Sequence, residues 1–103
     1  MRNAFTMQLK PGFADEYKKR HDEIWPELET LLSESGISDY SIFLDETTHT
    51  LFAVQELAAD FDPEAIPQHP IVQKWWAYMA DIMETHPDHS PLSQPLREVF
   101  HMD

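Results

Sequence analysis

Hydrophobic and polar positions recur with two different periods along this chain, and each period predicts a type of element. In NAFTMQLK, residues 3–10, apolar and polar or small positions alternate, which is typical of a strand. Over residues 13–35 the apolar positions recur every three or four residues if Tyr17 and His21 are counted among them. That spacing predicts a single helical face. Gly36 follows as a helix stop.

The second half of the chain repeats this change of period. Residues 39–57 read as two strands around the polar turn DETTHT, which predicts a hairpin. Residues 58–70 hold three prolines and are predicted as a loop or a short helix. Pro70 begins a further helix with apolar residues at helical spacing. The closing stretch LREVFHM, residues 96–102, is predicted as the last strand.

This order of elements predicts a fold class. Four strands, with helices between the first and second and between the third and fourth, indicate an α+β ferredoxin-like sandwich in one domain spanning residues 1–103. Helices on one face leave the other face of the sheet bare. Met7, Phe43, Phe52 and Phe100 are predicted to supply apolar groups to that face. A second copy of the chain would cover it, so we expect a homodimer.

Composition narrows the partners of such a fold. The 103 residues include seven Lys and Arg against 19 Asp and Glu, a net charge of -12, which argues against nucleic acid and highly phosphorylated substrates. The absence of cysteine excludes disulfides, thiolate metal sites and cysteine nucleophiles. With only two glycines there is no phosphate-binding loop. The composition therefore favours a neutral small molecule as the ligand.

The apolar runs and the N-terminus give an expectation about location. The longest apolar runs, such as LFAV and WWAYMA, are far shorter than the roughly 20 residues that span a bilayer. The N-terminal MRNAFTMQLK has no apolar core of a secretory signal. We therefore expect a cytoplasmic protein without a membrane partner.

Two residues within the first helical segment are unusual. His21 lies on the apolar stripe one turn after Tyr17, where a functional histidine and a satisfied core histidine are both possible. Pro26 cannot donate a hydrogen bond to the carbonyl of Asp22, so it predicts a kink there, unless it begins a second helix. A kink would turn the backbone of residues 21–23 toward a cavity.

The adjacent tryptophans Trp75 and Trp76 are the second unusual feature. Neighbouring helical residues point about 100° apart, so one ring packs inward and the other lies at a cleft edge or an interface. One interpretation is core packing plus a dimer contact. The other is a sugar platform, in which Tyr17, Tyr40, His21 and one tryptophan form an apolar pocket with a few polar groups.

Metal binding has little support in the sequence. The histidines other than His21 are scattered, and HPDH, residues 86–89, is the one thin candidate. We therefore predict no metal site.

Four motifs together resemble the L-rhamnose mutarotase family. They are the H-x-x-I-W-P-E-L of residues 21–28, YSIFLD of residues 40–45, WWAYMADIM of residues 75–83 and HPDHSPLSQPLREVFHMD of residues 86–103. The resemblance runs in register from Met1 to the C-terminus and is weakest over residues 58–69.

The resemblance implies a cofactor-free aldose 1-epimerase that interconverts the α and β anomers of L-rhamnose, with the fold of a dimeric α+β barrel. The proton-donating histidine of the family falls on His21. Its substrate-contacting residues fall on the two tyrosines and two tryptophans already singled out, Tyr17, Tyr40, Trp75 and Trp76. Phe43 departs from the tyrosine expected there, which puts one sugar contact in doubt.

The chemistry that follows is general acid catalysis at the ring oxygen by His21, since an imidazole gives and takes protons near neutral pH. The tyrosines would bond sugar hydroxyls or relay protons, and the tryptophans would stack on the sugar. Three alternatives remain at this point. They are a mutarotase for another deoxyhexose such as L-fucose, a non-catalytic dimeric-barrel binding module, and a cofactor-free monooxygenase on a similar barrel.

Overall fold

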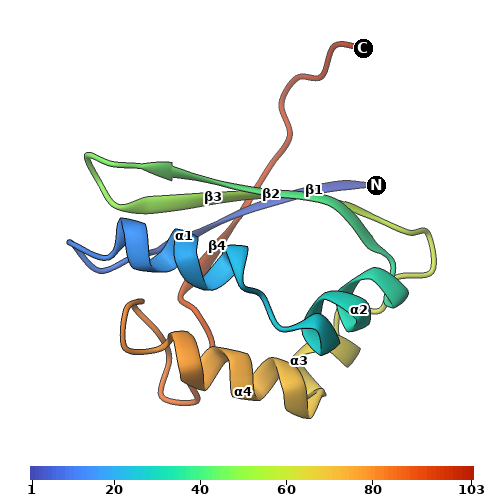
Figure 1. Ribbon diagram of the computed structural model, residues 1–103. Coiled ribbons are helices and arrows are strands. Elements are labelled where there is room, and N and C mark those ends of the chain that lie inside the picture. Colours follow the sequence, from blue (N-terminus) through green and yellow to red (C-terminus); the bar gives the residue numbers. More distant parts are fainter.

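The computed structural model describes residues 1–103 and contains one four-stranded sheet with its helices on one face (Figure 1). The strands are β1 (Arg2–Gln8), β2 (Ile37–Asp45), β3 (Thr50–Leu57) and β4 (Ser93–Leu96). They lie in the order β2-β3-β1-β4, and all neighbours are antiparallel. This order confirms the predicted ferredoxin-like α+β sandwich.

The first helical segment consists of two helices, so the prediction of one kinked helix over residues 13–35 is wrong. α1 (Ala14–Asp22) ends before Pro26, and α2 (Pro26–Glu34) begins at it. Trp25 has extended backbone angles (φ -60°, ψ 127°), as a residue before proline prefers. Because proline has no N–H to lose at the first position of a helix, Pro26 begins α2, the alternative that the sequence also allowed.

The remaining helices begin where the sequence predicts them, although α4 ends at Met79, before the last apolar positions of the predicted helix at residues 82 and 83. α3 (Ala65–Gln68) is a short helix within the proline-rich segment, and α4 (Pro70–Met79) begins at Pro70. His69 caps α4, since its Nδ1 accepts the backbone N–H of Ile71. None of the helices has the length and apolar character that crossing a bilayer requires.

Strand register decides which side chains enter the core between sheet and helices. Met7 lies opposite Leu51, and Phe5 lies opposite Ala53. Leu51 and Ala53 are completely buried in the core cluster, and Met7 joins them there. The prediction that Met7 lies on the bare face is therefore wrong, because side chains directly opposite each other share a face.

The bare face keeps two of the predicted aromatic residues. Phe43 and Phe52 are direct cross-strand neighbours, one residue out of phase with the core-facing Leu51. Phe43 exposes 64% of its surface and Phe52 38%. The face of the sheet without helices therefore carries an exposed aromatic pair.

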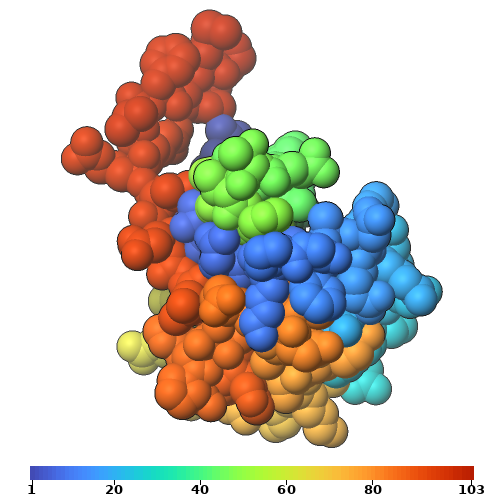
Figure 2. Space-filling model, turned by 90° about the vertical axis from the view of Figure 1, so that its left-hand side faces the viewer, coloured from blue at the N-terminus to red at the C-terminus, as the bar shows by residue number.

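The C-terminal residues leave the sheet earlier than predicted. β4 ends at Leu96, opposite Ala4, because β1 begins at Arg2 and offers little strand beyond that point. Residues 97–103 form an arm that extends past the sheet, away from the helices (Figure 1), and projects from one side of the molecule (Figure 2). His101 on the arm keeps one contact with the sheet, since its Nδ1 lies 2.7 Å from Nη1 of Arg2. The predicted strand over residues 96–102 is thus wrong, and Phe100 lies on the arm rather than on the sheet.

Gly36 connects α2 to β2 in a conformation that a side chain would oppose. Its φ is +100°, and a Cβ placed on it would lie 2.9 Å from the Cβ of Ala58. The carbonyl of Gly36 also accepts the N–H of Ala58 at 2.8 Å, which fixes this close approach. The predicted helix stop at Gly36 is confirmed.

Gly36→Ala is expected to lower the free energy of unfolding by about 2–4 kcal/mol, from backbone strain and overpacking together. Gly12→Ala is the matched control, because Gly12 also has a positive φ (+89°) but no atom within 4 Å of the place that an added Cβ would take. It should cost only the backbone strain, about 1–2 kcal/mol. Urea unfolding at fixed protein concentration measures the free energy of unfolding of both variants. Equal decreases in the two variants would contradict the contact with Ala58.

Candidate active site

Tyr17 and His21 form the centre of a group of aromatic side chains under the sheet. They lie four residues apart on one face of α1, and their rings stack with centroids 4.2 Å apart. Tyr17 is buried and His21 is half-buried. The apolar stripe that the sequence predicts on this helix is therefore real, with the histidine as a member of it.

A hydrogen bond fixes the proton on His21. Its Nδ1 lies 3.1 Å from the backbone carbonyl of Tyr17. A carbonyl oxygen only accepts, so Nδ1 is the protonated nitrogen of the neutral ring and Nε2 carries the lone pair. Nε2 is thus the nitrogen that can exchange a proton with a ligand.

Burial lowers the pKa of His21 below its ordinary value of 6.5. The hydrogen bond to the Tyr17 carbonyl and the charge of Asp22 act in the opposite direction but are weaker. Removal from water disfavours the charged imidazolium, and because this effect is larger than the other two, the pKa is lowered.

Trp75 on α4 closes the group from the other side. Its ring meets His21 edge-on at 5.4 Å and Trp25 edge-on at 5.0 Å. Tyr78, one turn further along α4, lies 5.5 Å from Trp25 and 5.7 Å from Trp75. Such offset and edge-on arrangements are the favourable ones for aromatic pairs.

Tyr40 reaches the same region because β2 contains a bulge. The register between β2 and β3 shifts between Ser38 and Ser41, so Asp39 and Tyr40 together oppose a single residue of β3. Asp39 accommodates the extra residue with a φ of 48°, which aspartate tolerates better than most side chains. Beyond the bulge, Ile42 faces the helices, so Tyr40, two residues before it, faces them as well.

The two tyrosine hydroxyls lie near each other in this enclosed region. Burial raises the pKa of Tyr40 to about 12, although 39% of the residue as a whole is exposed. Burial, and then the Tyr40 hydroxyl, raise the pKa of Tyr17 well above its ordinary value. Both tyrosines are therefore neutral phenols at physiological pH, able to donate and accept hydrogen bonds.

Polar atoms at the centre of this group remain without a partner in the chain. The Tyr17 hydroxyl, His21 Nε2 and the Trp75 indole N–H make no hydrogen bond within the protein. No fully buried side-chain nitrogen or oxygen lacks a partner, so each of the three reaches accessible space. Apolar walls with a few converging polar atoms are typical of a small-molecule site.

Comparison with known proteins decides what kind of site this is. The family model for L-rhamnose mutarotase matches residues 2–102. An L-rhamnose mutarotase of Flavobacterium johnsoniae is 62% identical over 103 residues, which is 100% of this chain and 96% of that protein. One from Jannaschia sp. is 62% identical over 99 residues, 96% of this chain and 95% of that protein.

The chain belongs to the L-rhamnose mutarotase family. A crystal structure of an L-rhamnose mutarotase from Formosa agariphila agrees with this in three dimensions. It superposes with a TM-score of 0.93 at 51% identity, covering 100% of this chain and 99% of that one. The resemblance found in the sequence is thereby confirmed.

The sequence singled out most residues of the group around His21 but not all of them. Trp76, half-buried, packs against the core cluster and makes no ring contact with the group around His21. Trp25 and Tyr78 join the group and were not predicted. The spacing that places them, His21 to Trp25 and Trp75 to Tyr78, is visible in the sequence, but only the helix break at Pro26 turns Trp25 toward Trp75.

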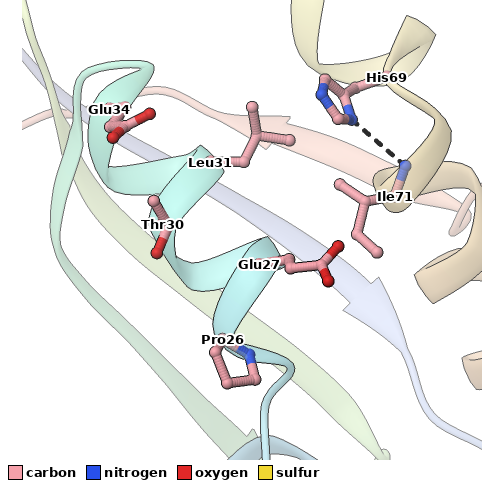
Figure 3. Close-up of a pocket in the computed structure, with 7 residues that line it drawn as sticks. All are labelled: Pro26, Glu27, Thr30, Leu31, Glu34, His69 and Ile71. Carbon is pink, nitrogen blue, oxygen red and sulfur yellow. Dashed lines mark hydrogen bonds between the residues drawn. The ribbon is translucent and has the colours of Figure 1, made fainter.

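A separate cleft of about 430 Å³ lies between α2 and the start of α4 (Figure 3). Glu27 and Leu31 point across it toward Ile71, and His69 lies at its far side. It contains no aromatic platform and none of the residues predicted to contact substrate. The cleft is therefore distinct from the group around His21.

The buried imidazole gives a measurable pH dependence. His21 is expected to titrate below 6.5 and to carry its proton on Nδ1 when neutral, which NMR titration and nitrogen shifts of the labelled ring measure. Because the unfolded chain then binds more protons, folding stability should fall as the pH drops below about 6.5 toward the lowered pKa. A titration at or above 6.5 would contradict the burial of the ring.

Proposed function

We propose that this chain is a cofactor-independent L-rhamnose mutarotase, an aldose 1-epimerase that interconverts the α and β anomers. The observation that carries the proposal is the free Nε2 of His21, held between Tyr17 and Trp75 in a chain that belongs to the L-rhamnose mutarotase family. We also take residues 1–103 as one mutarotase domain, because a single sheet and one core cluster position every residue of the site.

The reaction needs proton transfers at two oxygens and no electron transfer. His21 Nε2, when protonated, gives its proton to the ring oxygen as the bond between that oxygen and the anomeric carbon breaks. The anomeric hydroxyl passes its proton along the tyrosine hydroxyls to solvent and becomes the carbonyl of the aldehyde. Rotation about the C1–C2 bond and closure from the other face complete the exchange, as Nε2 takes its proton back from the attacking hydroxyl and the carbonyl oxygen regains a proton from solvent along the same path.

The other residues bind and orient the sugar. Tyr17 and Tyr40, held as neutral phenols, hydrogen-bond sugar hydroxyls and relay the proton of the anomeric hydroxyl. Trp75 offers its ring edge and indole N–H at the site, and Trp76 supports the same segment of α4. L-Rhamnose has a methyl group at C6, which suits aromatic walls of this kind.

The aromatic group around His21 is a better sugar site than the cleft between α2 and α4. The cleft is lined by two carboxylates and a histidine that caps α4, with no ring on which a sugar could stack. The group around His21 combines stacked rings with unpaired polar atoms.

His21→Ala is expected to abolish the acceleration of anomeric exchange, a loss of about 10²- to 10⁴-fold in kcat. Magnetisation transfer between the two anomeric proton signals of L-rhamnose measures it. His86→Ala is the matched control, because the His86 side chain lies outside the aromatic group and makes no hydrogen bond. L-Fucose in the same assay tests the sugar, and binding without acceleration by the native chain would favour a binding module.

We further propose that the protein is a homodimer, in which a second copy covers the bare face of the sheet. The exposed pair Phe43 and Phe52 lies on that face, and the arm of residues 97–103 extends on the same side. Val99, Phe100 and Met102 on the arm each expose more than three quarters of their surface. Apolar groups gathered on one side of a small protein are typical of an interface.

Phe43→Glu is expected to convert the protein to a monomer, because it places a charge on the apolar face that the second copy would cover. The native chain should sediment at twice its 12.1 kDa mass. Thr30→Glu, which adds the same charge on the exposed side of α2, should leave the mass unchanged. A native chain that sediments as a monomer at micromolar concentration would overturn this proposal.

A further inference from the structure

We propose that Arg20 is a positioning residue of the reaction, which holds the turn of α1 that carries His21 at its place against α4. This inference rests on the proposed mutarotase activity. Arg20 precedes His21 in the chain, and its side chain connects the end of one helix to the end of another.

The strongest part of this attachment is a two-point bond to Asp81. Arg20 Nη1 donates to Oδ1 of Asp81 at 2.9 Å, and Nη2 donates to Oδ2 at 3.2 Å. Only 11% of the Arg20 side chain is exposed, whereas Asp81 is 66% exposed. The planar guanidinium matches the carboxylate at both oxygens, which fixes orientation as well as distance.

Arg20 also bonds to a further group on each of the two helices. Nη1 donates to the carbonyl of Tyr78 at 2.9 Å, in the last turn of α4, where helix carbonyls lack partners. Nε donates to Oε2 of Glu16 at 2.8 Å, one turn back on α1. The guanidinium is therefore tied to both helices at once.

The same side chain holds one ring of the aromatic group. The guanidinium carbon lies 4.5 Å from the centre of the Tyr78 ring, within cation–π distance. Tyr78 in turn contacts Trp25 and Trp75, and Trp75 contacts His21. Arg20 thus connects to His21 along the chain and, through Tyr78 and Trp75, across the site.

A second basic residue of α1 provides the comparison. Lys18 donates to Asp22 at 2.8 Å, but 77% of Lys18 and 62% of Asp22 are exposed, and the pair lies within one helix. Removing Lys18 takes away the same positive charge as removing Arg20 without touching α4. Differences between the two variants therefore report the attachment and not the charge.

Arg20→Met is expected to lower kcat for L-rhamnose anomer exchange by about tenfold or more, with a smaller change in KM, because a misplaced His21 affects proton transfer more than sugar binding. In the same variant the ring-proton NMR signals of His21 should shift, because its contact with the Trp75 ring on α4 is loosened. Lys18→Met should change neither kcat nor these signals.

Two further variants keep the test decisive if Arg20→Met does not fold. Asp81→Asn weakens the attachment from the α4 side and should lower kcat and shift the His21 signals in the same direction. Arg20→Lys keeps the charge but not the two-point bond, and should restore only part of kcat. Native kcat and native His21 signals in folded Asp81→Asn and Arg20→Lys would overturn the positioning role.

The proposed function and this inference fail in different ways. If the native chain does not accelerate exchange, the proposed function is wrong, yet the His21 signals still show whether Arg20 positions the ring. If the native chain is active and these variants lose only thermal stability, Arg20 is a purely structural residue.

Discussion

The arrangement of the site depends on one constraint, the helix break at Pro26. A continuous helix over residues 14–34 would keep Trp25 one turn beyond His21 on the same straight face. Proline lacks the N–H that such a helix needs and forces Trp25 into an extended conformation. The chain therefore turns between α1 and α2, and Trp25 packs edge-on against Trp75 instead of following His21. One backbone restriction thus brings α1, α2 and α4 to a common aromatic group.

A second backbone irregularity completes the group from the sheet side. Without the extra residue in β2, strict alternation between Ile37 and Ile42 could not place both toward the helices, since they differ by an odd number of positions. The bulge at Asp39 shifts the alternation of side chains along β2 by one residue, so that Ile37 and Ile42 both face the helices and Tyr40 is brought toward Tyr17. The positive φ of Asp39 is a local strain that the neighbouring strand pairs offset. Both irregularities are short and both serve to aim an aromatic side chain.

Much of the fold could be predicted from sequence because the period of the apolar positions is a local signal. The strand and helix periods and the turn residues suffice for the order of elements, and Pro70 and Gly36 mark boundaries directly. The errors have a different origin. Met7 and the end of β4 depend on register with a distant strand, and the bulge depends on which residues of β2 pair with β3. Tyr17, His21 and Trp75 could be selected as unusual residues on apolar faces, whereas Trp25, Tyr78 and Arg20 matter through contacts between helices that no single segment reveals.

The electrostatics of the site suit a neutral substrate and a weakly basic target atom. His21 is surrounded by rings, and the nearby positive charge of Arg20 is balanced by Asp81 and Glu16. Burial therefore dominates and leaves the imidazole mostly neutral at pH 7, which reduces the protonated fraction. The same burial makes protonated His21 a stronger acid than free histidine. The ring oxygen of a sugar is a weak base, so its protonation needs a strong acid. A neutral sugar preserves this environment, whereas an anionic one would meet the net charge of -12 on approach and would stabilise the imidazolium once bound.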